Sequence, residues 1–373
     1  MNKRIAILTY HKAFNCGAML QAWALKAELE KNGCIVEFPA CNKVGVVPRW
    51  ISLPQLKDVR GFRKLKLWLS QLVINILSIG FEDYNRIAYR CFRCRYLPER
   101  NCRPEKFADF YDCAVVGSDQ VWHPMISKTD TKLFLAESIP ATFPVVSYAA
   151  SYGDNSLMPD AFNRLTKALH RFKAISVREE LACSELKGVG FKAEIVLDPT
   201  LLLEASEYRP LIGERLIRGK YLFLYAVSLS DFVLATAREL AKRLGLKLVI
   251  CGVYVRTKYR TPPECLWGIS PEKMVTLIAH ADAVLASSFH GTAFSVIFSK
   301  PFLSLRDSVD THPTRISTLL ESIGISDRIA NPETDMETMV QRLNATVYWN
   351  EVHGKISELR QKSRKFLRGA LEI

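Results

Sequence analysis

The stretch that decides the fold is residues 3–38, which contains KRIAILTY (3–10), a turn, a helix-like segment (18–31) and CIVEF (34–38). The first and last of these are short runs rich in apolar and β-branched residues, which is typical of buried strands. The middle segment has the apolar spacing of an amphipathic helix and ends at an Asn-Gly pair, a common helix stop. A strand, a helix and a second strand in this order predict a parallel sheet.

The same alternation continues along the chain in two sets separated by a break near 200–218. Strands are predicted in the first set at 111–117, 144–150, 174–177 and 193–197, and in the second at 221–227, 247–251, 283–286 and 301–305. Helices are predicted between them, for example at 231–244, 271–280 and 291–298. We therefore predict an α/β fold with two Rossmann-like domains, 1–200 and 218–345, followed by a C-terminal helix at 350–373.

The composition of the chain is that of an ordinary globular protein. Its 373 residues are 49% apolar and 24% charged, which excludes a disordered chain, a collagen-like chain and a coiled coil. A membrane-spanning helix needs roughly 20 predominantly apolar residues, and the uncharged run nearest to that, at 67–81, is shorter and contains polar residues. The apolar stretch at 5–8 is too short for a secretory signal, so we expect a cytoplasmic protein.

The ten cysteines are scattered through predicted strands and helices, as expected for a reducing compartment. Cys91, Cys94 and Cys102 have spacing that suggests zinc, but the segment offers no clear fourth ligand. The sequence therefore predicts no metal site.

The net charge of +13 is concentrated in a basic helical excursion at 56–106. Residues 57–106 hold twelve Lys or Arg against five Asp or Glu, a surplus of seven. One interpretation is a core helix followed by a solvated basic helix, and another is an interfacial helix in peripheral contact with anionic membrane, at its inner face. Nucleic-acid binding would also use such charge, but no recognised nucleic-acid motif accompanies it, so we expect no nucleic-acid partner.

Two loops that follow predicted strands of the first set carry candidate acceptor groups. Asn15 and Gly17 lie between the first strand and the first helix, where a glycine lets backbone N–H groups approach a ligand closely, or simply makes the turn. Asp119 follows the strand 111–117 and suits a general base or a hydroxyl-binding group, although it would also serve as a cap of the next turn. Trp122, three residues later, offers a platform for a sugar ring.

Two further loops carry candidate anion-binding and acid–base groups. Arg178 follows the strand 174–177 at a helix start, which suits bidentate capture of a carboxylate or phosphate and is also an ordinary helix start. The stretch SSFHGTAFS (287–295) is the most specific, because it places His290 where a strand meets the N-terminus of a helix. An imidazole there is suited to acid or base work near neutral pH, and the amides beyond it can meet an anion. There is no G-x-G-x-x-G after either first strand and no Walker-type loop, which argues against dinucleotide binding.

These stretches together resemble the polysaccharide pyruvyl transferase family over most of the chain. The motifs that carry the resemblance are LTYHKAFNCGAMLQAWAL (8–25), VVGSDQVWHP (115–124), SYAASYG (147–153), ISVREE (175–180), VLDPTLLL (196–203) and SSFHGTAFSVIFSKPF (287–302). The resemblance implies a glycosyltransferase-B-like pair of Rossmann-like domains. It also implies transfer of the enolpyruvyl group of phosphoenolpyruvate onto two hydroxyls of a sugar, on a polysaccharide or lipid-linked oligosaccharide precursor of capsule or exopolysaccharide, with a pyruvate ketal formed and phosphate released.

One departure from the family bears on the donor site. Some members carry Arg-Leu-His where this chain has Ser288-Phe289-His290, so an anion-binding arginine is missing and Arg178 or Arg315 is expected to supply the charge. Two alternatives therefore stay open: a nucleotide-sugar glycosyltransferase of the two-Rossmann class, and a non-catalytic glycan-binding relative.

The predicted site follows from these positions. The predicted catalytic residues are His290 as general acid and Asp119 as base or acceptor anchor, with no cofactor besides the donor substrate phosphoenolpyruvate. The predicted donor-binding residues are Arg178, Ser288, Gly291, Thr292 and Arg315, and the predicted acceptor-binding residues are Asn15, Gly17, Gln120 and Trp122.

Overall fold

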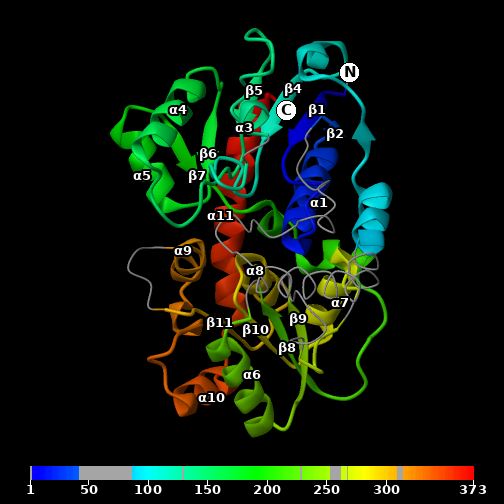
Figure 1. Ribbon diagram of the computed structural model, residues 1–373, viewed down its shortest axis with the longest axis vertical. Coiled ribbons are helices and arrows are strands. Elements are labelled where there is room, and N and C mark those ends of the chain that lie inside the picture. The colour runs from blue at the N-terminus through cyan, green and yellow to red at the C-terminus, as the bar shows by residue number, and fades with distance from the viewer. Residues whose placement is uncertain are drawn as a thin grey trace, which may run out of the picture.

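The computed structural model describes residues 2–41, 86–127, 130–226, 229–252, 262–266, 268–308 and 314–373, and consists of two α/β halves stacked along the long axis of the molecule (Figure 1). Each half contains a parallel five-stranded sheet flanked by helices. The predicted α/β fold with two Rossmann-like sheets is therefore confirmed.

The first half is organised around a sheet with the strand order β3-β2-β1-β4-β5. Its strands are β1 (Arg4–Leu8), β2 (Ile35–Pro39), β3 (Glu99–Arg100), β4 (Cys113–Val116) and β5 (Val145–Ser147). A parallel pair, β6 (Ile175–Val177) and β7 (Ala193–Ile195), extends this sheet, because the N–H groups of Ser147 and Ala150 donate to the carbonyls of Ala174 and Ser176. The helices are α1 (Cys16–Lys31), α3 (Thr131–Phe134), α4 (Pro159–Leu169) and α5 (Glu180–Gly188), with the 3₁₀ helix η2 (Pro104–Asp109).

The second half repeats this arrangement with the strand order β12-β11-β10-β8-β9. Its strands are β8 (Tyr221–Ala226), β9 (Lys247–Gly252), β10 (Ala283–Ala286), β11 (Phe302–Leu305) and β12 (Ile329–Ala330). Its helices are α6 (Asp231–Arg243), α7 (Pro271–His280), α8 (Phe289–Ile297), α9 (Arg315–Ser322) and α10 (Met336–Asn344), with the 3₁₀ helix η5 (Ser326–Arg328). Two further 3₁₀ helices, η3 (Pro199–Leu202) and η4 (Ala205–Leu211), connect the halves.

Helix α1 begins two residues earlier than its apolar pattern predicts, because the side chain of Asn15 caps it. The Asn15 Oδ1 accepts a hydrogen bond from the Ala18 N–H at 3.2 Å, which satisfies one of the free donors of the first turn. The helix is buried on most sides, since it covers the first sheet and also packs against η3 and α7. Helix α1 of the first half therefore packs against the second half.

The two halves share a hydrophobic core. Trp23 on α1 packs against Tyr208 of η4, which in turn packs against Phe294 on α8, with ring centroids 5.4 and 5.1 Å apart. Burial of aromatic rings contributes much of the apolar area removed from water. The contact fixes α1 and α8 close together.

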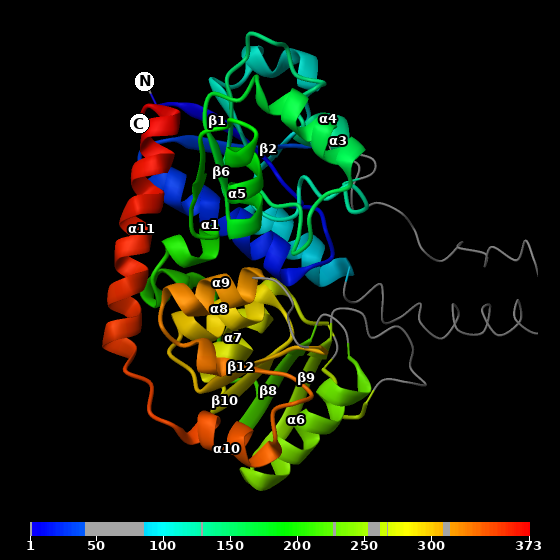
Figure 2. The same ribbon diagram turned by 90° about the vertical axis from the view of Figure 1, so that its left-hand side faces the viewer.

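The C-terminal helix α11 (Trp349–Leu371) runs along both halves, as Figure 2 shows most clearly. In the first half the Arg364 guanidinium donates two hydrogen bonds to Glu28 on α1, at 2.7 and 2.9 Å. In the second half the His353 ring lies 2.8 Å from the Ser299 hydroxyl. The predicted helix at 350–373 is thus present and links the two halves.

The basic excursion is described only from residue 86 onward, where residues 86–96 form a helix. The prediction of lipid contact rests largely on residues 57–85, which lie outside the described residues. Within the described ranges, no helix has the length and apolar character needed to cross a membrane.

Candidate functional site

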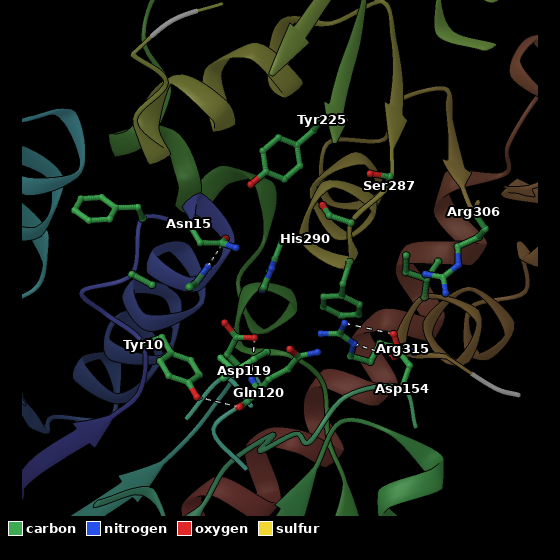
Figure 3. Close-up of a pocket in the computed structure, with 17 residues that line it drawn as sticks. Tyr10, Asn15, Asp119, Gln120, Asp154, Tyr225, Ser287, His290, Arg306 and Arg315 are labelled. Atoms are coloured by element: carbon green, nitrogen blue, oxygen red, sulfur yellow. Dashed lines mark hydrogen bonds and ion pairs between the residues drawn. The ribbon is translucent and has the colours of Figure 1, made fainter. Parts of the chain in front are cut away.

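A cavity of about 610 Å³ lies between the carboxyl ends of the two sheets, and Figure 3 shows its lining. Ligands of open α/β sheets bind at this edge. The cavity is lined by Tyr10, Ala13, Phe14, Asn15, Ala18, Asp119, Gln120, Ile126, Asp154, Tyr225, Ser287, Ser288, Phe289, His290, Arg306, Arg315 and Ile316. Five of the predicted site residues besides His290 are in this set, namely Asn15, Asp119, Gln120, Ser288 and Arg315.

The N-terminus of α8 forms one wall of the cavity. Ser288 is the N-cap, and its Oγ accepts a hydrogen bond from the Gly291 N–H at 3.0 Å. The side chain of Thr292 points away from the cavity into the second half, where its hydroxyl lies 2.7 Å from that of Ser304. The N–H of Thr292 donates to the Ser288 carbonyl at 3.1 Å, so the backbone donors of both Gly291 and Thr292 are used within the helix start. Neither residue lines the cavity, and their role in donor binding stays a prediction.

His290 lies between the two halves and is 8% exposed. Its Nε2 is 3.6 Å from Oδ2 of Asp198, the residue before η3. On the other side of the ring, α1 comes so close that a Cβ on Gly17 would collide with the His290 Nδ1. Gly17 does not line the cavity, and its role in the structure is to let α1 approach the imidazole.

Asp119 reaches the cavity from a turn that follows β4. Gly117 has a φ of +118°, and a Cβ there would collide with the carbonyl oxygen of Tyr148, so the turn requires glycine. The Asp119 Oδ1 accepts hydrogen bonds from the Gln120 N–H at 2.9 Å and from Arg178 at 3.2 Å. These contacts fix the carboxylate at the cavity wall.

Arg178 is buried and surrounded by carboxylates. Its Nη1 donates to Asp198 at 2.8 Å, its Nη2 to Asp119 at 3.2 Å and its Nε to Glu179 at 3.3 Å, while Phe289 stacks 5.2 Å from the guanidinium. Burial opposes the charged form, but the three carboxylates raise the pKa of Arg178 above its ordinary value. Its donors are thus used inside the protein, and it does not line the cavity, in contrast to its predicted role in donor binding.

Arg315 is the first residue of α9 and faces the cavity from the second half. Its Nε and backbone N–H donate to Oδ1 of Asp154, at 3.0 and 3.2 Å, across the boundary between the halves. Burial alone would raise the pKa of Asp154, but the charge and hydrogen bonds of Arg315, and the charge of Arg306, lower it. Arg306 and Arg315 are the arginines on the cavity wall, as Figure 3 shows.

The first half contributes the polar groups opposite these arginines. Asn15 lines the cavity while capping α1, and the Tyr10 hydroxyl donates to the Gln120 carbonyl at 3.1 Å. Trp122 lies elsewhere: it is buried, packs against Phe172 and donates from its indole to a backbone carbonyl. It therefore offers no exposed face to a sugar in this structure, in contrast to its predicted role.

Several cavity residues were not predicted from the sequence. Asp154 and Arg306 follow the strand-like runs 144–150 and 301–305, so the strand-end rule used for Asp119 would have found them. Asp198, which contacts His290 but does not line the cavity, stands in the VLDPT motif, where a carboxylate before proline is indistinguishable from a helix cap. Among the described residues, no group of three or more His, Cys, Asp or Glu side chains could hold a metal ion.

The comparisons with solved structures show the fold. The UDP-GlcNAc 2-epimerase from Neisseria meningitidis bound to UDP-GlcNAc is 13% identical, with 100% of this chain and 99% of that chain covered and a TM-score of 0.51. A putative UDP-N-acetylglucosamine 2-epimerase from Listeria monocytogenes is 12% identical, with 96% and 90% covered and a TM-score of 0.50. The glycosyltransferase SnogD from Streptomyces nogalater is 11% identical, with 99% and 100% covered and a TM-score of 0.45. No curated protein sequence matches the chain significantly.

The family comparison is more specific than the fold. The model of the family described as polysaccharide pyruvyl transferase matches residues 15–308, a span that contains Asn15, Asp119, Asp198, His290 and Arg306. Members of such a family are transferases. The chain belongs to the polysaccharide pyruvyl transferase family.

Proposed function

We propose that this chain transfers the enolpyruvyl group of phosphoenolpyruvate onto two hydroxyls of one sugar, in a polysaccharide or lipid-linked oligosaccharide precursor, and forms a pyruvate ketal. The observation that carries the proposal is the cavity between the two sheets, which is lined together by His290, two arginines and a carboxylate from the opposite half. Such an arrangement combines an anion site, an acid–base group and an acceptor wall in one space.

The donor is assigned to the wall formed by the second half. Phosphoenolpyruvate carries a carboxylate and a phosphate, which arginine side chains and helix N-termini bind well. Arg306 and Arg315 line the cavity, and α8 and α9 both begin at it with Ser288 and Thr314 as their N-caps. We therefore assign donor binding to Arg306, Arg315 and the start of α8 rather than to the buried Arg178.

The chemistry requires one proton to be delivered and two to be removed. We assign to His290 the role of general acid that protonates the methylene carbon of phosphoenolpyruvate, so that the central carbon becomes cationic and one sugar hydroxyl adds to it with loss of its proton. The carbon–oxygen bond to phosphate then breaks, and the second hydroxyl adds with loss of its proton. The methylene carbon thus gains one proton and the two hydroxyls lose one proton each. The second of these two protons leaves with the phosphate.

Asp119 is assigned to the acceptor side as base or hydroxyl anchor. Its carboxylate lines the cavity and its orientation is held by the Gln120 N–H and by Arg178. Asn15, Tyr10 and Gln120 line the same wall and supply polar groups that suit sugar hydroxyls. We keep a lipid-linked acceptor in capsule or exopolysaccharide assembly, at the inner face of the membrane, as part of this proposal.

The test is an assay of phosphate release from phosphoenolpyruvate with a panel of lipid-linked sugars and oligosaccharides, combined with mass spectrometry of the acceptor. The acceptor should gain the mass of one pyruvate less one water, and the same panel with sugar nucleotides should give no glycosyl transfer. Glycosyl transfer without release of phosphate from phosphoenolpyruvate would contradict the proposal.

The assignment of His290 is tested by His290→Gln in that assay. Loss of a general acid should reduce kcat about 10²–10⁴-fold. His123→Gln is the matched control, because His123 packs against Gly153 beside the cavity and does not line it. Near-wild-type turnover of His290→Gln, or an equal loss in the control, would show that the acid role is wrong.

A further inference from the structure

A buried carboxylate between the two halves, that of Asp198, faces the imidazole of His290. We infer that Asp198 is the positioning residue for His290, which it holds in one ring orientation and one protonation pattern. The inference rests on the proposed function, because it explains how the general acid of that reaction is kept in place. It adds a residue that lies outside the cavity lining and touches no substrate.

The Asp198 carboxylate is itself rigidly held. It is 2% exposed, and its Oδ1 accepts from the Thr200 N–H at 3.0 Å and from the Thr200 hydroxyl at 2.8 Å. Its Oδ2 accepts from the Ser118 hydroxyl at 3.2 Å and from Arg178 at 2.8 Å. With four donors satisfying both oxygens, the carboxylate has little freedom to turn away from His290.

The imidazole is confined on two sides by groups of the first half and the connection between the halves. On one side, His290 Nε2 is buried without a hydrogen-bond partner among the described residues and lies 3.6 Å from the Asp198 Oδ2. On the other side, Gly17 of α1 has no side chain and leaves Nδ1 uncovered where a Cβ would collide with it. Nδ1 is therefore the ring nitrogen that would exchange a proton with the donor, because Nε2 faces Asp198. The proton of a neutral ring is therefore expected on Nε2, because that atom faces the carboxylate.

The charged groups around the pair support an ionised Asp198. Burial would raise the pKa of this carboxyl, but the neighbouring His290 and Arg178 lower it well below its usual range. Beyond Arg178 lie the carboxylates of Asp119 after β4 and Glu179 before α5, and α1 contributes the uncharged Gly17. The anion that faces His290 therefore persists at neutral pH.

The arrangement also makes the orientation of the general acid His290 depend on the packing of the two halves. His290 belongs to α8 of the second half, whereas Gly17 belongs to α1 of the first, and Asp198 stands at the start of the connection between them. The imidazole is thus oriented only while the halves are packed together, and the same packing forms the cavity.

The first test uses the wild-type protein and no activity. Nitrogen–proton correlation spectra of the histidine rings, with the His290 signal identified as the one missing from His290→Gln, should show a proton on Nε2 at high pH. A proton on Nδ1 would overturn the inference. This result stands whatever the acceptor is, so it separates the inference from the proposed function.

The second test compares Asp198→Asn with the control Thr200→Val. The asparagine removes the charge at Oδ2, whereas the valine removes a hydrogen bond to Oδ1 and leaves Oδ2 intact. Without the carboxylate no negative charge faces Nε2, so the share of ring protons found on Nδ1 at high pH should increase in Asp198→Asn and stay as in the wild type in Thr200→Val. An unchanged proton position in Asp198→Asn would overturn the inference.

Turnover gives the third readout. Because a misplaced catalytic group typically loses about 10²-fold, Asp198→Asn should lower kcat by about that factor with little change in the KM for phosphoenolpyruvate. If the proton position changes in Asp198→Asn but the wild-type protein releases no phosphate with any acceptor, the proposed function fails and the positioning role stands. Normal turnover of Asp198→Asn would refute the positioning role alone.

Discussion

Arg178 and Arg315 occur in similar sequence patterns, but the structure places them in different environments. Both stand at a helix start near the edge of a parallel sheet. The Arg178 side chain is 2% exposed and paired with three carboxylates, whereas that of Arg315 is 19% exposed, lines the cavity and forms hydrogen bonds with one carboxylate, Asp154. The same residue type is therefore part of the core in one half and part of the cavity wall in the other.

The comparison shows that the depth of burial decides whether an arginine contributes mainly to stability or to ligand binding. A buried ion that loses its partner is very costly, so a buried cluster of charges is sensitive to any change of charge. The Arg315–Asp154 pair, with side chains 19% and 25% exposed, is reached by more water, which weakens its contribution to folding, and its partner can be exchanged for an incoming anion. We expect Arg178 to matter for folding and Arg315 to matter for donor binding.

The largest expected effect is on folding, in Arg178→Met. Removal of the guanidinium takes away the cation closest to the buried carboxylates of Asp198 and Glu179, which should lower the free energy of unfolding by about 3–5 kcal/mol. Denaturant unfolding measures this value, with Arg315→Met as the control, expected to change it by less because the Arg315 side chain is more exposed than that of Arg178. A stable Arg178→Met that fails to bind phosphoenolpyruvate would reverse the comparison.

The next effect is on the donor, in Arg315→Met. Loss of charge-assisted hydrogen bonds to an anion typically costs about 1.5–3 kcal/mol, so the Kd for phosphoenolpyruvate should rise roughly 10–100-fold. Titration calorimetry measures it, and Arg215→Met serves as the control, because Arg215 pairs with Asp282 away from the cavity. Equal affinities of Arg315→Met and the wild type would remove Arg315 from the donor site.

The smallest expected effect is a pH dependence of stability, and it concerns Glu179, one of the three carboxylates that contact Arg178. Burial raises the pKa of Glu179 despite the neighbouring Arg178, and its Oε2 is buried without a hydrogen-bond partner among the described residues. A carboxyl whose pKa is raised by folding contributes stability that is full below its unfolded pKa and is lost as pH rises through the folded value. The substitution Glu179→Gln removes this pH-dependent contribution to the free energy of unfolding.

The free energy of unfolding of the wild type relative to Glu179→Gln should therefore decrease as the pH rises above about 4.5, the ordinary range of a glutamic acid. Denaturant unfolding of both proteins at increasing pH is the measurement. Glu180→Gln, at the exposed position next to it in the chain, is the control. A difference that grows with rising pH would contradict the sign assigned to Glu179.

Much of the candidate site was predictable because it follows a rule of parallel sheets. Asp119 and His290 were found as polar residues just past apolar strands, and the structure brings both to one cavity. The same rule applies to Asp154 and Arg306, which were not identified because a single acidic or basic residue after a strand is common. Trp122 shows the limit of the rule, since an aromatic residue in such a loop packs in the core here.

The sequence by itself determined the alternation of strands and helices, the two parallel sheets and the family, because apolar periodicity and local motifs are properties of neighbouring residues. Only the tertiary structure decided what Gly17, Arg178 and Asp198 do. Each acquires its role from contacts that the chain fold makes: Gly17 and Asp198 with His290 of the second half, and Arg178 with three carboxylates at once, two of which are 20 and 59 residues away. Such contacts depend on how deeply each group is buried and which charges surround it, and neither is encoded in the spacing along the chain.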